Sequence, residues 1–80
     1  MEFIIKSPTS SQTMNIKWLD VETTHGSLVI QPGHAPLISV LAPNKELTIK
    51  LQDDSTTVMT ISGGILEVLR NKIILLITND

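Results

Sequence analysis

The sequence contains no cysteine, so disulfides and thiolate metal sites are excluded. Aromatic side chains are almost as scarce, because the chain has one Trp, one Phe and no Tyr. Its six Lys and Arg residues are scattered along the chain rather than gathered in a cluster. Nucleic-acid binding relies on basic groups that neutralise phosphates and on aromatic rings that stack with bases. The sequence therefore predicts no nucleic-acid partner.

Long hydrophobic runs are also missing. The longest apolar run, Ile73–Ile77, has the length of a strand, whereas a membrane-spanning helix needs roughly 20 residues. The N-terminal segment Met1–Lys6 has neither the charged start nor the apolar stretch of a signal peptide. We therefore expect no direct membrane insertion and no secretory signal.

Most of the chain instead alternates apolar and polar residues with a period of two. The clearest example is Glu46–Gln52, in which Leu47, Ile49 and Leu51 share one face. The same pattern predicts strands at Phe3–Lys6, Ile16–Val21, Leu28–Ile30, Leu37–Leu41, Glu46–Gln52, Ser55–Ile61, Ile65–Arg70 and Ile73–Thr78. The polar segment Thr9–Thr13 is interpreted as a loop or an irregular edge strand.

These strands predict one all-β domain over residues 1–80, and no window of helical length has the apolar spacing of an amphipathic helix. Short strands with turns roughly every eight to twelve residues are typical of an antiparallel sandwich or barrel, and the pattern does not distinguish the two. The same parity places Trp18 on an outward face. The predicted core residues are Leu19, Val21, Leu28, Ile30, Leu47, Ile49, Leu51, Leu66, Val68 and Leu75.

The segment Gln31–Leu37, which we call the proline loop, contains two prolines, a glycine and a histidine. Pro32 and Pro36 each hold the backbone φ at about −65° and remove one backbone donor, so neither a helix nor a central strand can pass through. Gly33 can adopt the positive φ that a tight turn after Pro32 requires. The pattern predicts a rigid loop with His34 at its tip, either as a structural corner or as a contact with a partner.

Candidate catalytic or metal-binding residues are few. His25 and His34 lack the spacing and the additional ligands of a usual metal site, so both are interpreted as surface or loop residues. Asp53 and Asp54 form a carboxylate pair at a predicted hairpin tip, where neither is desolvated enough to shift its pKa for acid–base chemistry. Ser62 lacks the strand-to-helix context of a hydrolase nucleophile. No enzymatic activity, metal or cofactor is predicted.

Two motifs, Pro32–Leu37 and Ser62–Val68, together carry a resemblance to a known family. The dipeptide Gly63–Gly64 in the second motif also indicates a bulge or a close approach of two backbones. In this order and at this separation, the motifs resemble the epsilon subunit of bacterial and plastid rotary (F-type) ATP synthases. The opening Met1–Pro8 and the ending Asn71–Thr78 resemble that family as well. The resemblance implies its N-terminal domain, a flattened antiparallel β-sandwich of about ten short strands.

The resemblance implies a non-catalytic subunit of the central stalk. In this family the sandwich contacts the gamma subunit, rests on the membrane-embedded ring, and helps to couple the two. The proline loop and the turn before it, with His25, Ser27, Gln31 and His34, correspond to the family region near these partners. Trp18 is a further candidate for a partner contact, because aromatic residues concentrate binding energy.

The sequence departs from the family pattern at three of its positions. Family members commonly have an acidic residue where Ser27 stands, a glycine where Val29 stands and a polar residue where Trp18 stands. Ser27 itself therefore offers no charge to the polar loops of the ring.

The family normally continues with two C-terminal helices that inhibit ATP hydrolysis. The 80 residues contain no counterpart of those helices, as in a natural short form or a trimmed product, so neither a helical hairpin nor inhibition by this chain is expected. With no transit peptide before Met1, the resemblance implies a bacterial or organelle-encoded origin and a peripheral position on the cytoplasmic face of the bacterial cell membrane. From the residues alone, the alternative is an autonomous β-sandwich module that binds a small ligand or a carbohydrate.

Overall fold

The computed structural model describes residues 1–78, which form eight strands. The strands are β1 (Glu2–Lys6), β2 (Ser11–Thr23), β3 (Gly26–Ile30), β4 (Leu37–Val40), β5 (Lys45–Leu51), β6 (Thr56–Ile61), β7 (Gly64–Val68) and β8 (Lys72–Ile77). They are rich in β-branched residues, which pack well on a pleated surface. The all-β prediction is confirmed, and the described residues contain no helix long and apolar enough to cross a membrane.

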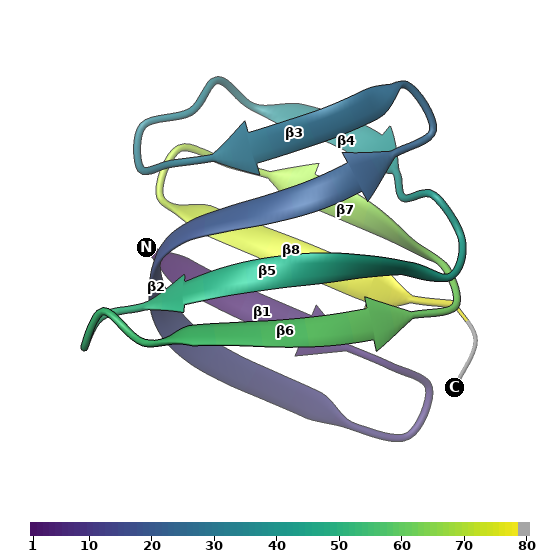
Figure 1. Ribbon diagram of the computed structural model, residues 1–80, viewed down its shortest axis with the longest axis horizontal. Helices are drawn as coiled ribbons and strands as arrows, with labels where there is room; N and C mark the ends of the chain where they lie inside the picture. Colours follow the sequence, from purple (N-terminus) through teal and green to yellow (C-terminus); the bar gives the residue numbers. More distant parts are fainter. Residues whose placement is uncertain (79–80) are drawn as a thin grey trace.

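The strands form two layers that face one another across a hydrophobic core (Figure 1). The order through the sheet is β4-β7-β8-β1-β2-β5-β6, and β3 pairs with β2. Layer A contains β4, β7, β8, β1 and the first part of β2. Layer B contains β3, the rest of β2, β5 and β6. The extents of 28 × 25 × 18 Å show a flattened sandwich, as expected.

Strand β2 belongs to both layers. Between Ile16 and Trp18 its register against β5 shifts by one residue, which is a β-bulge. The extra residue reverses the inward–outward alternation, so Ile16 and Leu19 are both buried although they are three positions apart. Of the polar segment Thr9–Thr13, Thr9 and Ser10 lie in the loop after β1, and Ser11–Thr13 form an edge strand that pairs with β1.

Two details refine the expected architecture. Strands β1 and β8 run parallel, with Phe3 beside Ile73 and Ile5 beside Leu75, although antiparallel pairs were expected throughout. Hairpin turns impose antiparallel pairing, but most of the chain lies between β1 and β8, so no turn sets their relative direction. The described residues also form eight strands rather than about ten, and one of them, β2, is 13 residues long.

The core between the layers consists of aliphatic side chains and Phe3. The predicted residues that are buried are Leu19, Val21, Ile30, Leu47, Ile49, Leu66, Val68 and Leu75. The other two, Leu28 and Leu51, are half-buried and pack against the core, because one lies on an outer strand and the other ends β5 at a turn. The structure adds to this core Phe3, Ile5, Ile16, Leu41, Ile61 and Ile73.

Gly64 begins β7 where two backbones come close together. A Cβ built on Gly64 would lie 2.8 Å from the carbonyl oxygen of Leu76 and 3.1 Å from the side chain of Leu75. The nearest heavy atom to a Cβ on Gly63 would be Thr78 Oγ1 at 3.7 Å, which is an ordinary contact. The close approach predicted at this glycine pair is therefore confirmed at Gly64.

Replacing Gly64 with Ala is expected to lower the free energy of unfolding by about 1–3 kcal/mol, because the new methyl group overlaps a backbone oxygen held in the β7–β8 pair. Urea unfolding followed by circular dichroism measures the change. Gly63→Ala is the matched control and should cost less than about 0.5–1 kcal/mol. Equal losses in the two variants would contradict the assigned clash.

Candidate partner-binding surfaces

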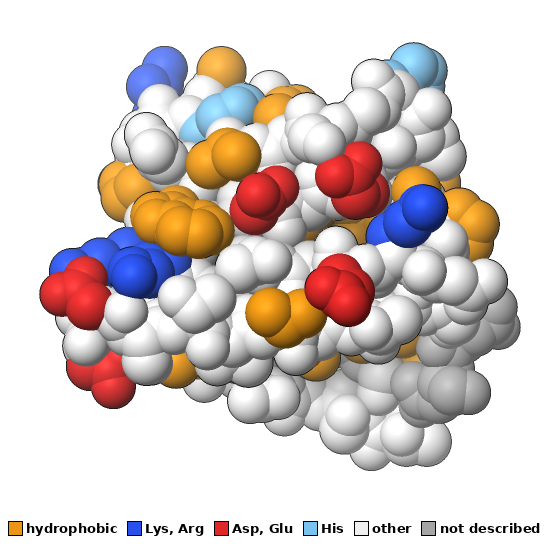
Figure 2. Space-filling view, viewed as in Figure 1, with side chains coloured by type: hydrophobic (Ala, Val, Ile, Leu, Met, Phe, Trp, Pro, Cys, Tyr) orange, Lys and Arg blue, Asp and Glu red, His pale blue; other side chains and the backbone are white. Residues whose placement is uncertain are grey.

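The residues predicted to contact partners are Trp18, His25, Ser27, Gln31 and His34. They do not form one cluster, because β3 separates the turn that holds His25 from the loop that holds His34. Figure 2 shows one histidine side chain at the upper right and the other, well apart from it, to the left of the centre. Trp18 precedes Leu19, which pairs with Ile30, so it lies near the His34 end of β3. The structure thus separates the predicted residues into two groups.

The β2–β3 turn holds His25 through hydrogen bonds to the backbone. Thr23 Oγ1 accepts a hydrogen bond from His25 N at 3.0 Å and donates one to Gly26 O at 2.8 Å. Gly26 has a φ of 117°, a value that favours glycine. The His25 ring is exposed, with its Nδ1 3.2 Å from Thr24 Oγ1. The turn therefore presents an imidazole from a well-defined backbone.

Glu22 is a charged residue of this edge that sequence reasoning missed. Ser27 Oγ donates a hydrogen bond to Glu22 Oε1 at 2.6 Å, and the two residues face each other across β2 and β3. The uncharged Ser27 therefore has a carboxylate beside it. The sequence could have indicated the Glu22–Ser27 pair only if the residues on each side of the His25 turn had been paired off in order, Thr23 with Gly26 and then Glu22 with Ser27.

The proline loop begins with a tight turn. His34 N donates a hydrogen bond to Gln31 O at 3.1 Å, and Gly33 has a φ of 85°, which confirms the predicted positive φ. Proline at the second position and a positive-φ glycine at the third are typical of a type II turn. Gly33 N also donates to Arg70 O at 2.8 Å, which ties the loop to the β7–β8 connection. The half-buried His34 ring has its Nδ1 2.7 Å from Ala35 O, so the loop itself orients the imidazole.

Trp18 lies on the outer face of layer B. It is half-buried, its neighbour Leu19 points into the core, and its partner across β5 is Lys50. The same face carries charged and hydroxyl side chains with scattered apolar ones (Figure 2). The outward position predicted for Trp18 is therefore found, and its shielding by a partner stays a prediction.

The outer face of layer A is mainly apolar, with the charged Glu67 between Ile38 and Ile74, and we call its apolar part the apolar face. Its members are Ile4, Ile38, Val40, Ile65, Ile74 and Leu76. These side chains point away from the core, because their neighbours along each strand point inward. The register brings them together, since Val40 pairs with Ile65 and Ile65 pairs with Leu76. Ile38 is 71% exposed and Val40 is 54% exposed.

The apolar face was not predicted from the sequence, although a signal for it exists. Phe3–Ile5 and Ile73–Ile77 are apolar at consecutive positions rather than at alternate ones. Such continuous runs are typical of strands that are covered on both faces. Here the core covers the inner side, and no residue from 1 to 78 covers the outer side. Contiguous exposed apolar surface of this kind marks interaction sites.

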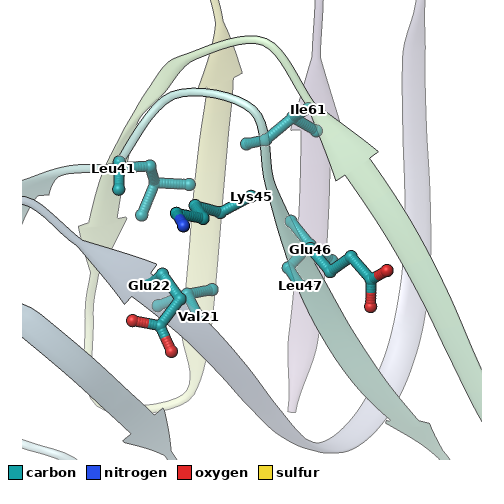
Figure 3. A pocket seen from close by; sticks show the side chains of 8 residues that line it. Val21, Glu22, Leu41, Lys45, Glu46, Leu47 and Ile61 are labelled. Carbon is teal, nitrogen blue, oxygen red and sulfur yellow. The ribbon is translucent and has the colours of Figure 1, made fainter.

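Two surface hollows offer little to a small ligand. A shallow depression, too narrow to hold a water molecule, is lined by Val21, Glu22, Leu41, Ala42, Lys45, Glu46, Leu47 and Ile61. Figure 3 shows the Lys45 side chain across this depression and the Glu46 carboxylate pointing away from it. A wider, open hollow of about 350 Å³ is lined by Glu2, Thr13, Met14 and Asn15. None of these lining residues is aromatic, and within residues 1–78 no three His, Cys, Asp or Glu residues gather as a metal site.

Asp53 and Asp54 lie in the turn between β5 and β6, and both are exposed. A hydrogen bond from the Lys17 ammonium lowers the pKa of Asp54. Hydrogen bonds from the Ser55 side chain and backbone lower the pKa of Asp53. Neither carboxylate has the raised pKa that desolvation would produce, as expected, and local hydrogen bonds lower both values. A general acid that acts near neutral pH needs a raised pKa instead.

Comparison with known proteins places the sandwich in a family. Residues 4–79 match the β-sandwich domain of the ATP synthase delta/epsilon chain. The chain belongs to this family. The ATP synthase epsilon chain of Corynebacterium aurimucosum is 40% identical over 55 residues, which are 69% of this chain and 45% of that relative. The resemblance to epsilon subunits that the two motifs indicated is confirmed.

Two solved structures share the fold of this delta/epsilon-family chain. One is the Tetrahymena thermophila mitochondrial ATP synthase central stalk and c-ring, with a TM-score of 0.83, 21% identity, and coverage of 99% of this chain and 63% of that chain. The other is the Euglena gracilis mitochondrial ATP synthase OSCP/F1/c-ring in rotational state 1, with a TM-score of 0.85, 16% identity, and coverage of 96% and 49%. At these identities the likeness shows the fold alone. The chain spans less than two thirds of each of these relatives.

In this delta/epsilon-family chain, replacing Lys17 with Ala is expected to raise the pKa of Asp54 toward its ordinary value. The pKa of Asp53 should change little, because Ser55 provides its main hydrogen bonds. A lowered pKa stabilises the fold above the ordinary value, and this contribution is lost as the pH falls through the lowered value. Lys17→Ala should therefore reduce stability slightly at neutral pH and not in strong acid.

Carboxyl-carbon NMR titration measures both pKa values. Ser55→Ala is the matched variant, and it should raise the pKa of Asp53 while leaving that of Asp54 nearly unchanged. An equal rise of both values in Lys17→Ala would contradict the separate assignments.

Proposed function

We propose that this chain is a non-catalytic subunit of the central stalk of a rotary ATP synthase, and that it couples the gamma subunit to the membrane-embedded ring. The match of residues 4–79 to the delta/epsilon β-sandwich carries the proposal. In this role residues 1–80 act as one domain. The sandwich combines an apolar face with two polar loops, which suits a part that contacts two partners.

The apolar face is the proposed docking surface for the gamma subunit. Ile38 and Val40 are each more than half exposed, so apolar area remains in water until a partner covers it. Covering such area contributes roughly 25 cal/mol per Å². Stable interfaces combine an apolar centre with a polar rim. The ion pair between Glu2 and Lys72, at 3.7 Å, belongs to the rim of this face.

The β2–β3 turn and the proline loop are the proposed contacts with the ring. They lie at the two ends of β3, the strand at the upper edge in Figure 1. The turn offers His25 and the Glu22–Ser27 pair, and the loop offers Gln31 and His34. These groups can exchange hydrogen bonds with polar loops of a partner. A loop that is already ordered also loses little entropy when it binds.

Trp18 lies on layer B, on the opposite side of the sandwich from the apolar face. We therefore assign it to a contact other than the gamma subunit. In the assembled enzyme the chain would lie peripherally on the cytoplasmic face of the bacterial cell membrane, held there by its protein partners.

A module for small ligands or carbohydrates is the second function that the residue pattern allowed. Sugar-binding sandwiches commonly use exposed aromatic rings as platforms. None of the described residues that line the two hollows is aromatic, so nothing favours this function over the first.

Replacing Val40 with Asp is expected to weaken binding of the gamma subunit at least tenfold, because a buried, unpaired carboxylate costs more than about 1.4 kcal/mol. Val58→Asp is the matched control: Val58 is 53% exposed against 54% for Val40, and it also lies on an edge strand, but in layer B. Titration calorimetry with the purified gamma subunit measures both affinities. The opposite result, with only Val58→Asp impaired, would move the interface to layer B.

The 80-residue chain by itself is expected neither to inhibit ATP hydrolysis nor to bind ATP. Strand β8 pairs with β1 on one side and β7 on the other, and Ile73 and Leu75 are fully buried. Releasing β8 would expose these side chains at about 1.5–3 kcal/mol each, a large share of the roughly 5–15 kcal/mol that stabilises a small protein. A switch made from β8 is therefore not expected.

Adding the chain to a catalytic head depleted of epsilon, and following the rate of ATP hydrolysis, tests this expectation. The rate should stay unchanged at saturating chain. Marked inhibition, or saturable ATP binding by the chain alone, would contradict it.

A further inference from the structure

Strand β6 forms an open edge of layer B. It is the last strand in the order through the sheet, and no strand within residues 1–78 pairs with its outer side. Its six residues, Thr56–Ile61, include no charged residue, no proline and no glycine. Proteins usually protect open edges with charges, prolines, bulges or short strands. The β6 edge lacks these devices and can therefore pair with a further strand.

The other edges are better protected or less suited to pairing. Strand β4 has four residues, lies between Pro36 and Pro43, and its Val40 carbonyl already accepts a hydrogen bond from Thr24 N at 3.1 Å. The first part of β2 also lacks charges and prolines, but its Ser, Gln and Asn residues pack less well on a pleated surface than the β-branched residues of β6. Strand β3 has five residues and lies between Gly26, with its φ of 117°, and the proline loop. The β6 edge is therefore the best candidate for intermolecular pairing.

We propose that the β6 edge pairs with the β6 edge of a second copy of this chain, in an antiparallel, two-fold symmetric ladder. In a two-fold pair, if residue i of one copy faces residue j of the other, then residue j of the first copy faces residue i of the second. Because the two strands are antiparallel, the numbers of any two facing residues add up to the same sum. Residues directly opposite in an antiparallel ladder have their side chains on the same face. The sum must therefore be even if the two copies of layer B continue as one sheet.

Among the registers with an even sum, the two that pair most of β6 are centred on Val58 and on Met59. In the Val58 register, Val58 faces its own counterpart, and Thr56 faces Thr60 of the second copy. Pairs of β-branched residues and pairs of threonines are favourable cross-strand neighbours. In the Val58 register, all facing side chains on the outer face of layer B (Thr56, Val58 and Thr60 of each copy) are therefore β-branched.

The charges on β5 add only a weak, screened preference for the Val58 register, because Lys50 and Glu46 of the two copies lie about 14 Å apart, three strand spacings. Within one copy, Thr56 is paired with Lys50 and Thr60 is paired with Glu46. When Thr56 faces Thr60 of the second copy, Lys50 lies next to this pair on one side, and Glu46 of the second copy lies next to it on the other side. In the Met59 register Thr56 faces Ser62 instead, and this complementarity is lost. The structure therefore favours a dimer of defined register.

This pairing is independent of the proposed function, because β6 lies in layer B and the apolar face of layer A stays uncovered. Stable interfaces bury roughly 1,000 Å² or more, and a single six-residue ladder is a small contact. We therefore expect a reversible dimer whose fraction rises with concentration.

Analytical ultracentrifugation of the 80-residue chain over a wide concentration range tests the proposal. The weight-average mass should rise from 8.8 kDa toward twice that value. Val58→Lys should hold the mass at that of the monomer, because two ammonium groups would face each other at the symmetry axis. The variant's circular dichroism should match that of the parent chain.

Two control variants locate the contact. Thr48→Lys adds the same charge to the same face but on the inner strand β5, and it should leave dimerisation unchanged. Val29→Lys adds the charge on β3, the other open edge of layer B, and should also leave it unchanged.

Single cysteine variants report the register, because the chain has no cysteine of its own. Val58→Cys places two thiols opposite one another, within reach of a disulfide, and should cross-link to itself. Thr56→Cys should not cross-link to itself but should cross-link to Thr60→Cys in a mixture of the two. A mass that stays at 8.8 kDa at the highest concentration would overturn the proposal. Loss of the dimer in Val29→Lys but not in Val58→Lys, or equal self-cross-linking of Thr56→Cys and Val58→Cys, would also overturn it.

Discussion

The bend of β2 from one layer to the other is the constraint on which the rest of the structure depends. A strand passes from one layer to the facing one through a sharp bend or a bulge, and a one-residue bulge also changes which residues point inward. The bulge between Ile16 and Trp18 makes that change, and it lets both Ile16 and Leu19 reach the core. Without it one of these side chains would face water, losing a burial worth about 1.5–3 kcal/mol.

The two layers that β2 joins have unlike outer faces, and this difference organises the surface. In layer A, strands β1, β7 and β8 carry apolar side chains on both sides, so the core takes one side and the other is left for a partner. In layer B the outer side carries threonines and charged residues, which water solvates without cost. A small domain that leaves so much aliphatic area exposed gains stability when a partner covers it.

The loops at the two ends of β3 are ordered by different interactions. Thr23 holds the β2–β3 turn through its hydroxyl group, whereas Pro32 and the hydrogen bond from Gly33 to Arg70 hold the proline loop. Each loop presents one histidine from a backbone that has few alternative conformations. A loop that is ordered in this way loses little conformational entropy when it binds a partner.

The sequence by itself determined the features that depend on neighbouring residues. Strand alternation followed from the period of two, the turn at Asp53–Asp54 from polar residues between two strands, and the positive φ of Gly33 from the proline before it. The family followed from two short motifs and is confirmed by the match over residues 4–79. Most of the predicted core is buried for the same reason, since a strand that packs on one side must bury alternate residues.

The tertiary structure alone decided which distant segments meet. Alternation states which side chains share a face, but it does not state which strand lies next to which. The parallel pairing of β1 with β8 is therefore visible only in the fold, as is the bulge that buries Ile16. The apolar face can be recognised only from the register of four strands. The position of the Glu22 carboxylate beside Ser27 likewise depends on the register of the β2–β3 hairpin. The physical reason is that contacts between distant segments are selected by packing of the whole core, whereas turns and alternation are set by local backbone geometry.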